Sequence, residues 1–331
     1  MARKALILGI SGQDGSYLAR SLLLKGYEVI GTSRDAQMNR FSNLIRLGIR
    51  DQLQVESVSI NDFRTVLHVL KRVQPDEVYN LAGQSSVGLS FDQPVESYES
   101  ISVATLNLLE AIRFLEYPIR LYNASSSECF GNTEGMAADE STPFRPRSPY
   151  AVAKAAAFWQ VANYREAYGL FACSGILFNH ESPLRPTRFV TKKIVEGACR
   201  VARGSRETLD LGNISVVRDW GWAPEYVEAM WLMLQQDGPD DYVIATGESH
   251  SLEEFVDAAF ASLKLKWRNH VNIRRDLYRP TDIQIGRANP AKAASALGWE
   301  ARYRMRDVAR MMVGAEISRQ STVLDREHEG G

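Results

Sequence analysis

A glycine-rich turn close to the start of the chain constrains its fold more than any other feature. The apolar run 4–10 leads into a GxxGxxG pattern, and a helix-like segment follows. The residues of this turn are Gly9, Ile10, Ser11, Gly12, Gln13, Asp14 and Gly15. Glycines at these positions let the backbone approach a pyrophosphate at a helix N-terminus. A glycine turn alone is often only a turn, but its place directly after a strand candidate predicts dinucleotide binding.

Short apolar runs alternate with helix-period segments through the first half of the chain. The strand candidates are 4–10, 28–32, 53–58, 77–81, 119–124 and 171–177. The helix-like segments lie near 15–25, 37–48, 61–73, 97–116 and 148–168. Strands that alternate with helices imply right-handed crossovers and a parallel sheet covered on both faces. We therefore predict an α/β fold with a doubly wound, Rossmann-type sheet, whose ligands lie at the carboxyl ends of the strands.

The second half has a different pattern and predicts a smaller, mostly helical C-terminal substrate lobe. Its helix-like segments lie near 189–203, 224–236, 251–263, 290–297 and 305–317. We expect a dinucleotide-binding domain over 1–178 with a returning segment at about 214–247. The substrate lobe would then comprise 179–213 and 248–320. The tail 321–331 lacks apolar periodicity, and we expect it to fray.

Composition excludes several classes of function. Lys plus Arg number 39 and Asp plus Glu number 40, a net charge of −1, which argues against nucleic-acid binding by a basic surface. No apolar run reaches the roughly 18–20 residues that span a bilayer, and the N-terminal segment does not resemble a signal peptide. The three cysteines and five histidines form no CxxC or HExxH spacing. We expect a cytoplasmic protein with no membrane partner, no disulfide framework and no metal site.

The end of the second strand candidate indicates which dinucleotide binds. NAD sites usually place an acid there for the ribose 2′-OH, whereas NADP sites use Arg for the 2′-phosphate. The chain has the small neutral Ser33 followed by Arg34, a pattern that favours NADP. Asp35 leaves NAD open, because it could serve an NAD ribose, and Arg34 could also be a solvated surface residue.

Tyr150 and Lys154 form a YxxxK pair on a helix introduced by Ser148-Pro149. The i,i+4 spacing places both side chains on one helix face. An ammonium close to a tyrosine lowers its pKa and prepares a phenolate to accept a hydroxyl proton while hydride leaves the same carbon. YxxxK alone occurs often by chance on amphipathic helices. Behind a GxxGxxG turn it predicts a redox site.

Ser125, Ser126, Ser127 and Glu128 end the strand that would face the nicotinamide. Alcohol oxidation needs a hydroxyl and a tyrosine there, but no carboxylate. A carboxylate beside a 4-keto sugar can remove the proton α to the carbonyl and then protonate a leaving hydroxyl. Glu128 therefore favours a dehydratase, although a solvated loop glutamate is the simpler alternative.

These residues resemble the extended short-chain dehydrogenase/reductases and, within them, the GDP-mannose 4,6-dehydratase family. The similarity spans about residues 3–317. Its marks are GISGQDGSYLA (9–19), VYNLAGQSSV (78–87), ASSSECFG (124–131), PRSPYAVAK (146–154), GILFNHESPLRP (175–186), FVTKKI (189–194), RDWGWAPEYVEAMW (218–231) and YRPTDI (278–283).

The resemblance implies conversion of GDP-mannose to GDP-4-keto-6-deoxymannose, a lyase reaction with NADP as cofactor. It implies the catalytic residues Ser126, Glu128, Tyr150 and Lys154. Implied cofactor contacts are the 9–15 turn, Arg34, Ile60, Leu81, Ala82, Gly83, Gln84, Ser85, Tyr150, Lys154, His180 and Arg185. Implied substrate contacts are Ser85, Ser126, Glu128, Tyr150, Asn179, Lys193, Arg218, Arg279 and Asp282. A homodimer or homotetramer is implied as well.

Three positions depart from the family pattern. Ser126 stands where the family usually has Thr, Arg34-Asp35 where it has an Arg pair, and Ser59-Ile60 where it has Asp-Leu near the adenine. Other reactions on this scaffold remain open: dehydration of a related GDP- or NDP-sugar, C4 reduction or epimerisation. A non-catalytic dinucleotide-binding regulator would have no reason to keep Ser126, Tyr150 and Lys154 together.

Overall fold

A seven-stranded parallel sheet forms the centre of the protein. The computed structural model describes residues 2–329, with side chains for 2–319. The strands are β1 (Lys4–Leu8), β2 (Glu28–Ser33), β3 (Gln54–Ser57), β4 (Glu77–Asn80), β5 (Arg120–Ser126), β7 (Ala172–Leu177) and β11 (Tyr242–Ile244). Their order, β11-β7-β5-β4-β1-β2-β3, is that of a doubly wound sheet. The predicted fold class is confirmed.

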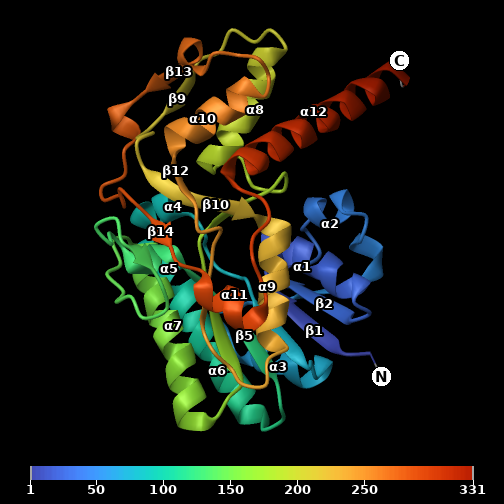
Figure 1. The fold of residues 1–331 in the computed structure, drawn as a ribbon. Coiled ribbons are helices and arrows are strands. Elements are labelled where there is room, and N and C mark those ends of the chain that lie inside the picture. Colours follow the sequence, from blue (N-terminus) through green and yellow to red (C-terminus); the bar gives the residue numbers. More distant parts are fainter. Residues whose placement is uncertain (1, 330–331) are drawn as a thin grey trace.

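Helices cover both faces of the sheet because its strands are apolar on both sides (Figure 1). On β1, Ala5 and Ile7 enter one core and Leu6 and Leu8 the other, as a period of two requires. The first core is completed by α1 (Gln13–Leu24) and α9 (Ala223–Leu234). The second is completed by α3 (Phe63–Val73), α6 (Ala104–Leu115) and α7 (Pro149–Tyr168).

Two predicted helices of the first half are shorter or interrupted in the structure. The segment near 97–116 forms α5 (Pro94–Tyr98), a π-helical turn (Glu99–Val103) and then α6, after the short α4 (Val87–Asp92). Ser97 and Ser100 hydroxyls donate to the carbonyls four residues earlier, and this back-bonding accompanies the π turn. Only α2 (Ser42–Arg46) forms within 37–48, because Asp35 accepts the backbone N–H groups of residues 37 and 38 in a turn.

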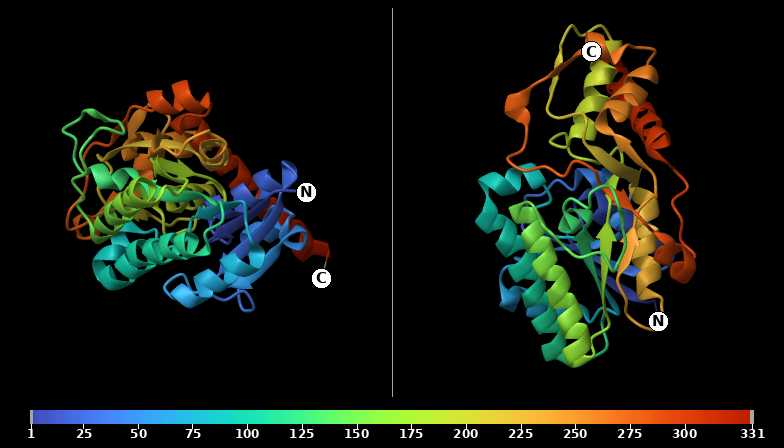
Figure 2. Two further views of the ribbon diagram at one scale, coloured as in Figure 1. Left: turned by 90° about the horizontal axis from the view of Figure 1, so that it is seen from below. Right: turned by 60° about the vertical axis from the view of Figure 1, so that its left-hand side comes forward.

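A second, mostly helical body lies at one end of the sheet (Figure 2). It packs α8 (Val190–Ala202), α10 (Leu252–Ala261) and the start of α12 (Met305–Glu329) around Phe255, Phe260 and Met312. The short strands β9 (Leu209–Leu211) and β13 (Val271–Ile273) pair beside these helices. By contrast, α11 (Ala291–Leu297), which lies within 248–320, packs on the first sheet core through Ala293 and Leu297.

Two small sheets join the main sheet to the helical body. One has the order β12-β10-β8, from β8 (Asn179–Glu181), β10 (Val217–Trp222) and β12 (Ser249–Ser251). The other pairs β6 (Ala137–Ala138) with β14 (Arg287–Ala288). After β10 the chain returns to the main sheet through α9 and β11, so residues far apart in sequence meet where β8 and β10 pair.

Helix α12 continues to Glu329, through most of the segment expected to fray; residues 330–331 lie outside the described residues. Residues 318–329 contain neither Gly nor Pro, so nothing in that stretch stops a helix.

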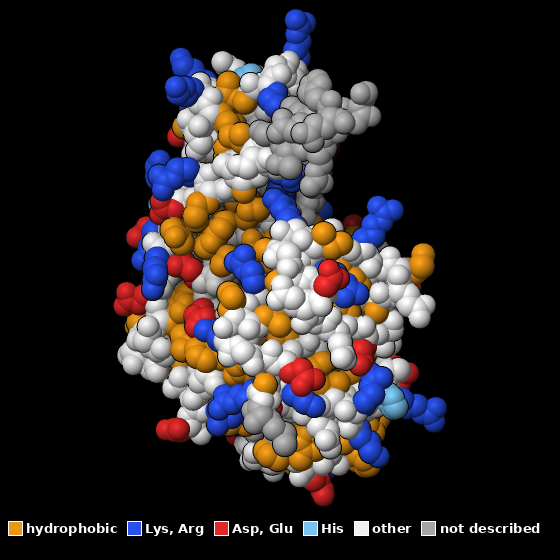
Figure 3. Space-filling model, turned by 90° about the vertical axis from the view of Figure 1, so that its right-hand side faces the viewer, with side chains coloured by type: hydrophobic (Ala, Val, Ile, Leu, Met, Phe, Trp, Pro, Cys, Tyr) orange, Lys and Arg blue, Asp and Glu red, His pale blue; other side chains and the backbone are white. Residues whose placement is uncertain are grey.

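Among residues 2–329, no helix is long and apolar enough to cross a membrane, and no cluster of three or more potential metal ligands occurs. Acidic and basic side chains are interspersed over the face shown in Figure 3.

A buried ion pair fastens α12 to α8. Lys192 Nζ lies 3.0 Å from Glu316 Oε2, whose side chain is fully buried, and Arg319 Nη2 lies 2.6 Å from Glu316 Oε1. Burial opposes the charge of Glu316, but Arg319 and Lys192 outweigh it and lower the pKa of this carboxyl to about 2. The pair therefore favours the ionised form of Glu316 in the folded protein.

We predict that Glu316→Gln destabilises the protein in a pH-dependent manner. A lowered pKa stabilises the fold above the unfolded value of about 4.3, by about 3 kcal/mol at neutral pH. That contribution is lost as the pH falls from about 4.3 towards 2. Urea unfolding at a series of pH values should show the gap between wild type and Glu316→Gln narrowing in acid. Glu300→Gln, at an exposed position, is the control and should show no gap at any pH. A pH-independent gap would contradict this account.

Candidate active site

The glycine turn after β1 packs so closely against neighbouring backbone that side chains would clash there. Gly9 has φ of +86°, and a Cβ there would lie 2.9 Å from the backbone nitrogen of Ala82. A Cβ on Gly15 would overlap the carbonyl oxygen of Gly9. Helix α1 starts at Gln13 behind Gly12, which provides no side-chain cap. The first amides of α1 thus face the carboxyl edge of the sheet uncapped, an arrangement that suits a pyrophosphate.

Three hydrogen bonds join the first turn of α1 to the segment around β8. Gln13 Nε2 donates to the carbonyl of His180 at 3.2 Å, and Ser182 Oγ donates to Gln13 Oε1 at 2.7 Å. Asp14 Oδ2 lies 2.9 Å from His180 Nε2. His180 also stacks on Tyr226 of α9, with ring centroids 4.6 Å apart. Asp14 and His180, predicted cofactor contacts, are therefore partners of one another in the structure.

The Asp14–His180 pair is an ion pair in a buried place. Burial opposes the charge of Asp14, yet His180 with Gln13 and Arg185 lowers the pKa of this carboxyl to about 2. Burial likewise opposes the charge of His180, but Asp14 outweighs it and raises the pKa of the imidazole. Each group holds the other in its charged form.

The segments after β3 and β4 lie at the same edge of the sheet. Leu81 and Ala82 contact the glycine turn, and Gly83 has φ of +119°. The backbone N–H of Gln84 donates to Ser100 Oγ at 3.1 Å, which sets the path of the segment that ends at Ser85. After β3, the carbonyl of Ile60 accepts from Asn107 Nδ2 at 3.2 Å. The structure thus gathers these predicted cofactor residues along one edge, as a doubly wound sheet requires.

Arg34 and Asp35 differ in how far their side chains are engaged. Arg34 is 85% exposed, and its Nη1 lies 3.5 Å from Glu96 Oε1 of α5. Asp35 Oδ1 accepts the N–H groups of Gln37 and Met38 at 3.0 and 2.9 Å. Asp35 therefore has a local structural role in its turn, whereas the guanidinium of Arg34 stands in solvent beside one carboxylate.

Helix α7 presents Tyr150 and Lys154 beneath the end of β5. Ser148 Oγ caps the helix by accepting from the N–H of Ala151 at 3.1 Å. Lys154 Nζ donates to the carbonyl of Ala124 at 2.6 Å and lies 5.9 Å from the Tyr150 ring centroid. Burial lowers the pKa of Lys154 to about 8 and raises that of Tyr150. Contrary to the expectation from spacing, burial outweighs any effect of the ammonium on the phenol.

Ser126 and Glu128 stand at the end of β5, where the chain enters a 3₁₀ turn (Ser127–Phe130). Ser126 Oγ accepts the N–H of Glu128 at 3.3 Å. The Ser126 side chain also lowers the pKa of the Tyr150 phenol and so opposes the effect of burial. Burial raises the pKa of Glu128, while Arg218 and Arg279 act against that rise. The hydroxyl, the phenol and the carboxyl thus form one cluster.

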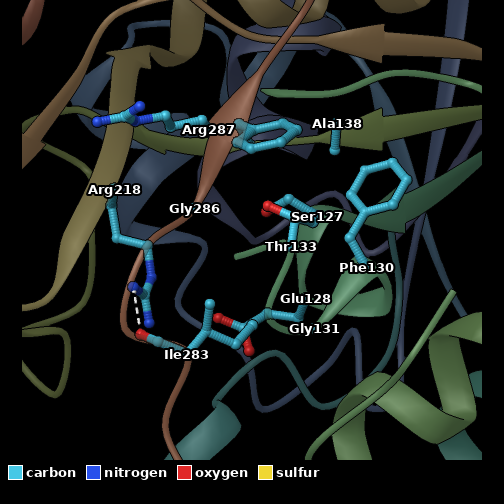
Figure 4. Close-up of a pocket in the computed structure, with 11 residues that line it drawn as sticks. Ser127, Glu128, Phe130, Gly131, Thr133, Ala138, Arg218, Ile283, Gly286 and Arg287 are labelled. Carbon is cyan, nitrogen blue, oxygen red and sulfur yellow. Dashed lines mark hydrogen bonds between the residues drawn. The ribbon is translucent and has the colours of Figure 1, made fainter. Parts of the chain in front are cut away.

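Arg218 of β10 reaches the same cluster from the other side. Its guanidinium donates to the carbonyl of Ile283 at 2.7 Å and to Asp282 Oδ1 at 3.0 Å. Arg279 Nη1 lies 3.5 Å from the same Asp282 oxygen. Figure 4 shows Arg218 and Glu128 on opposite sides of one pocket, with the Arg218–Ile283 hydrogen bond dashed. Four residues predicted separately therefore meet here: Glu128, Arg218, Arg279 and Asp282.

The remaining predicted residues lie further along the linking segments. Lys193 Nζ donates to the carbonyl of Asp210 at 2.6 Å, within the helical body. Asn179 opens β8 opposite Trp220 in the β10 register. Arg185 Nε lies 3.1 Å from Glu181 Oε2, and its guanidinium carbon is 3.7 Å from the Phe189 ring centroid. The ammonium of Lys193 is therefore hydrogen-bonded within the helical body and not to the Glu128 cluster.

Several pocket residues carry no sequence signal. The wall beside Glu128 is formed by Phe130, Thr133, Ala138, Phe178, Gly286 and Arg287. They come from three stretches of the chain, 130–138, 178 and 286–287. Phe130 and Phe178 lie within the quoted family motifs, but the other four residues belong to none. Pairing of β6 with β14 brings the 131–138 and 286–288 segments together, so only tertiary structure identifies them.

Comparison with known proteins places the chain among sugar-nucleotide enzymes. The family model described as GDP-mannose 4,6 dehydratase matches residues 6–312. GDP-mannose 4,6 dehydratase 1 of Arabidopsis thaliana is 44% identical over 97% of this chain and 92% of the relative. The Vibrio cholerae GDP-mannose 4,6-dehydratase is 40% identical over 96% and 94%. The Thermus thermophilus UDP-glucose 4-epimerase, solved with NAD, has a TM-score of 0.82 and 28% identity over 95% and 98% of the two chains.

We predict that Asp14→Asn lowers the pKa of His180. The carboxylate is the largest influence that favours the charged imidazole, and without it burial dominates. NMR titration of the His180 ring should show its midpoint move to lower pH. Asp62→Asn, which alters the capping side chain of α3 and does not contribute to the pKa of His180, is the matched control and should leave that midpoint in place. An unchanged midpoint in Asp14→Asn would refute the ion-pair assignment.

Proposed function

The chain belongs to the GDP-mannose 4,6-dehydratase family, and we propose that it converts GDP-mannose to GDP-4-keto-6-deoxymannose. One observation carries this proposal beyond the family match. The carboxyl of Glu128 lies in a cluster with the Ser126 hydroxyl and the Tyr150 phenol, and faces Arg218 across a pocket. A site that only moved hydride between a sugar alcohol and a cofactor would need the hydroxyl and the phenol, but not this carboxyl.

We propose that a nicotinamide dinucleotide, specifically NADP, binds along the edge from the glycine turn to Gln84 and Ser85. The fit rests on the tight glycine turn that leads from β1 into α1 and on the uncapped start of α1 at the carboxyl edge of the sheet. The exposed Arg34 guanidinium favours a 2′-phosphate, and Asp35, already used by two backbone N–H groups, offers less to an NAD ribose. When bound, the nicotinamide supplies a hydride acceptor for sugar C4 and the hydride that later reaches C6.

Tyr150 is the group that takes the O4 proton in this proposal. Its phenol is buried and protonated in the free protein, because burial raises its pKa. Ser126, which lowers the pKa of that phenol, orients the sugar hydroxyl. Lys154, held by the carbonyl of Ala124 with a pKa of about 8, supplies the positive charge that stabilises a phenolate. Proton acceptance by a positioned base typically accelerates a reaction by about 10²–10⁴-fold.

Glu128 is the acid and base of the elimination. Once C4 is a ketone, the C5 proton is acidic, and the Glu128 carboxylate removes it. The protonated carboxyl then delivers a proton to the C6 hydroxyl, which leaves as water. A pKa raised by burial makes Glu128 a stronger base than a solvated carboxylate, while Arg218 and Arg279 keep the ionised form accessible.

The diphosphate and the nucleoside would be held by the linking strands and the helical body. Arg218 and Arg279, which share Asp282 in the free protein, can bind phosphate oxygens through paired donors. Asn179 at the start of β8 and Lys193 on α8 lie on the path towards the helical body. We therefore propose that the main sheet binds the dinucleotide and that the helical body binds the GDP moiety.

C4 reduction or epimerisation of a related nucleotide sugar is the second candidate, because it would use the same Ser126, Tyr150 and Lys154. It would leave Glu128 without a role.

We also propose a cytoplasmic homodimer or homotetramer. Free, buried cysteines suit a reducing compartment, and the packed helices α6 and α7 expose Phe114 and Trp159.

Glu128→Gln tests the dehydratase proposal. An amide cannot accept the C5 proton, so C4 oxidation should proceed while water elimination stops. We expect enzyme-bound NADPH to accumulate on addition of GDP-mannose, and formation of the 6-deoxy product to fall by about 10²–10⁴-fold. Absorbance of the reduced nicotinamide and mass spectrometry of the sugar nucleotide measure the two effects.

Tyr150→Phe is the matched comparison, because it removes one oxygen from the same cluster but acts at the earlier step. It should form neither bound NADPH nor product. Normal dehydration by Glu128→Gln would eliminate Glu128 as the base. Stoichiometric consumption of NADPH by the wild type, with no dehydrated product, would favour the reductase instead.

Arg34→Ala tests the cofactor assignment. Only NADP(H) carries the 2′-phosphate, so loss of one charge-assisted contact should weaken it by about tenfold or more, with little effect on NAD(H). Titration with both cofactors measures the selectivity. Glu96→Gln is the control: it frees Arg34 from its present partner and should preserve or strengthen NADP(H) binding. Equal losses for both cofactors in Arg34→Ala would remove the basis for NADP.

A further inference from the structure

A narrow pocket adjoins Glu128 and Arg218. Ser127, Glu128, Thr133, Arg218, Gly286 and Arg287 are among its lining residues, whereas Ser126, Tyr150 and Lys154 are not. The space between the lining atoms is of the order of one water molecule, too small for a sugar ring. Glu128 therefore has two faces, one towards the redox cluster and one towards this pocket.

The chemistry of the proposed reaction gives such a pocket a purpose. The C5 proton passes to Glu128 and departs on the C6 hydroxyl, so the C5–H and C6–O bonds break and one water forms. The resulting C5=C6 bond is reduced at C6 and must gain a proton at C5. The O4 proton that leaves through Tyr150 is balanced by the proton added at C5, and the hydride taken from C4 returns at C6. The sugar therefore loses one water overall. The site must therefore release one water, and Glu128 must gain a new proton, within each turnover.

The walls of the pocket suit water. Ser127 and Thr133 contribute hydroxyls, and Thr133 Oγ1 donates to the carbonyl of Met136 at 2.6 Å, which leaves its oxygen able to accept. A water in such a place needs two to four polar partners, which these hydroxyls and the Glu128 carboxyl supply. At the rim, Arg287 is exposed, and Figure 4 shows its side chain extending away from Glu128. The pocket thus extends from the Glu128 carboxyl to the exposed Arg287 at its rim.

We propose that this pocket is the water route of the active site: it carries away the water formed at C6 and delivers the proton that Glu128 places on C5. The proposal rests on the proposed dehydratase function. It assigns Ser127 and Thr133 as polar steps of the route and Gly286 as the residue whose missing side chain keeps it open.

Gly286 allows the route to be closed without strain. A Cβ at this position would lie 3.6 Å from Arg218 Cδ and 3.7 Å from the Val217 carbonyl oxygen, both ordinary contacts. Gly286→Ala should therefore fold and narrow the pocket, and Gly286→Leu should fill it. Gly238→Leu is the matched control, because Gly238 is exposed and a Cβ there would meet no atom within 4 Å.

The experiment is turnover of protiated GDP-mannose in deuterated water by the holoenzyme, with deuterium at C5 of the product measured by NMR. In the wild type the departing water exchanges with solvent, and C5 should carry deuterium almost completely. In Gly286→Leu the water is retained, so its single protium competes for return and C5 protium should rise several-fold. Gly286→Ala should fall between the two, and Gly238→Leu should match the wild type. The deuterium content at C5 is measured per product molecule formed, so it reports the fate of the water whatever the rate of turnover in each variant.

The outcomes separate the two proposals. Unchanged C5 deuterium in Gly286→Leu would overturn the water route while leaving the dehydratase intact. If Gly286→Leu does not fold, Gly286→Ala decides in the same way: a rise in C5 protium supports the route, and unchanged deuterium rejects it. Absence of any dehydrated product from the wild type would overturn the proposed function and the route with it.

Discussion

The hydrogen bonds between the first turn of α1 and β8 tie the whole site together. Gln13 and Asp14 belong to the glycine turn, and their partners His180 and Ser182 belong to the segment that leaves the main sheet. Because β8 pairs with β10, the same contacts set the position of Arg218 relative to the glycine turn. These bonds therefore connect the dinucleotide edge of the sheet to the strands that carry Arg218.

Burial dominates the electrostatics of the redox cluster. It raises the pKa of Tyr150 and Glu128 and lowers that of Lys154 to about 8, so the free protein disfavours charge on all three groups. The opposite holds for Asp14 and His180, where a direct pair at 2.9 Å outweighs burial. The protein therefore keeps Asp14 and His180 charged where α1 contacts β8. It leaves the reacting groups poised to change protonation state.

The parts of the protein that could be predicted are those governed by local rules. Alternating apolar runs identified the strands of the main sheet as far as β7, and the glycine turn was located by backbone requirements that only Gly satisfies at Gly9 and Gly15. The YxxxK spacing placed Tyr150 and Lys154 on one face because helix geometry is regular. Where local hydrogen bonds compete, the pattern was less accurate. The helix near 97–116 formed but contains a π turn before α6, and the Asp35 turn shortens α2.

Which long-range neighbours a residue acquires was decided only by the tertiary structure. The sequence by itself determined the fold class, the strand edge that binds ligands and the candidate side chains, because periodicity, glycine content and spacing are properties of short segments. It could not show that burial outweighs Lys154 in setting the pKa of Tyr150, since burial depends on every element packed around the site. Nor could it show that Gly286 lies beside Arg218 at the Glu128 pocket, because that contact arises from the bridge between Val217 and Ile285.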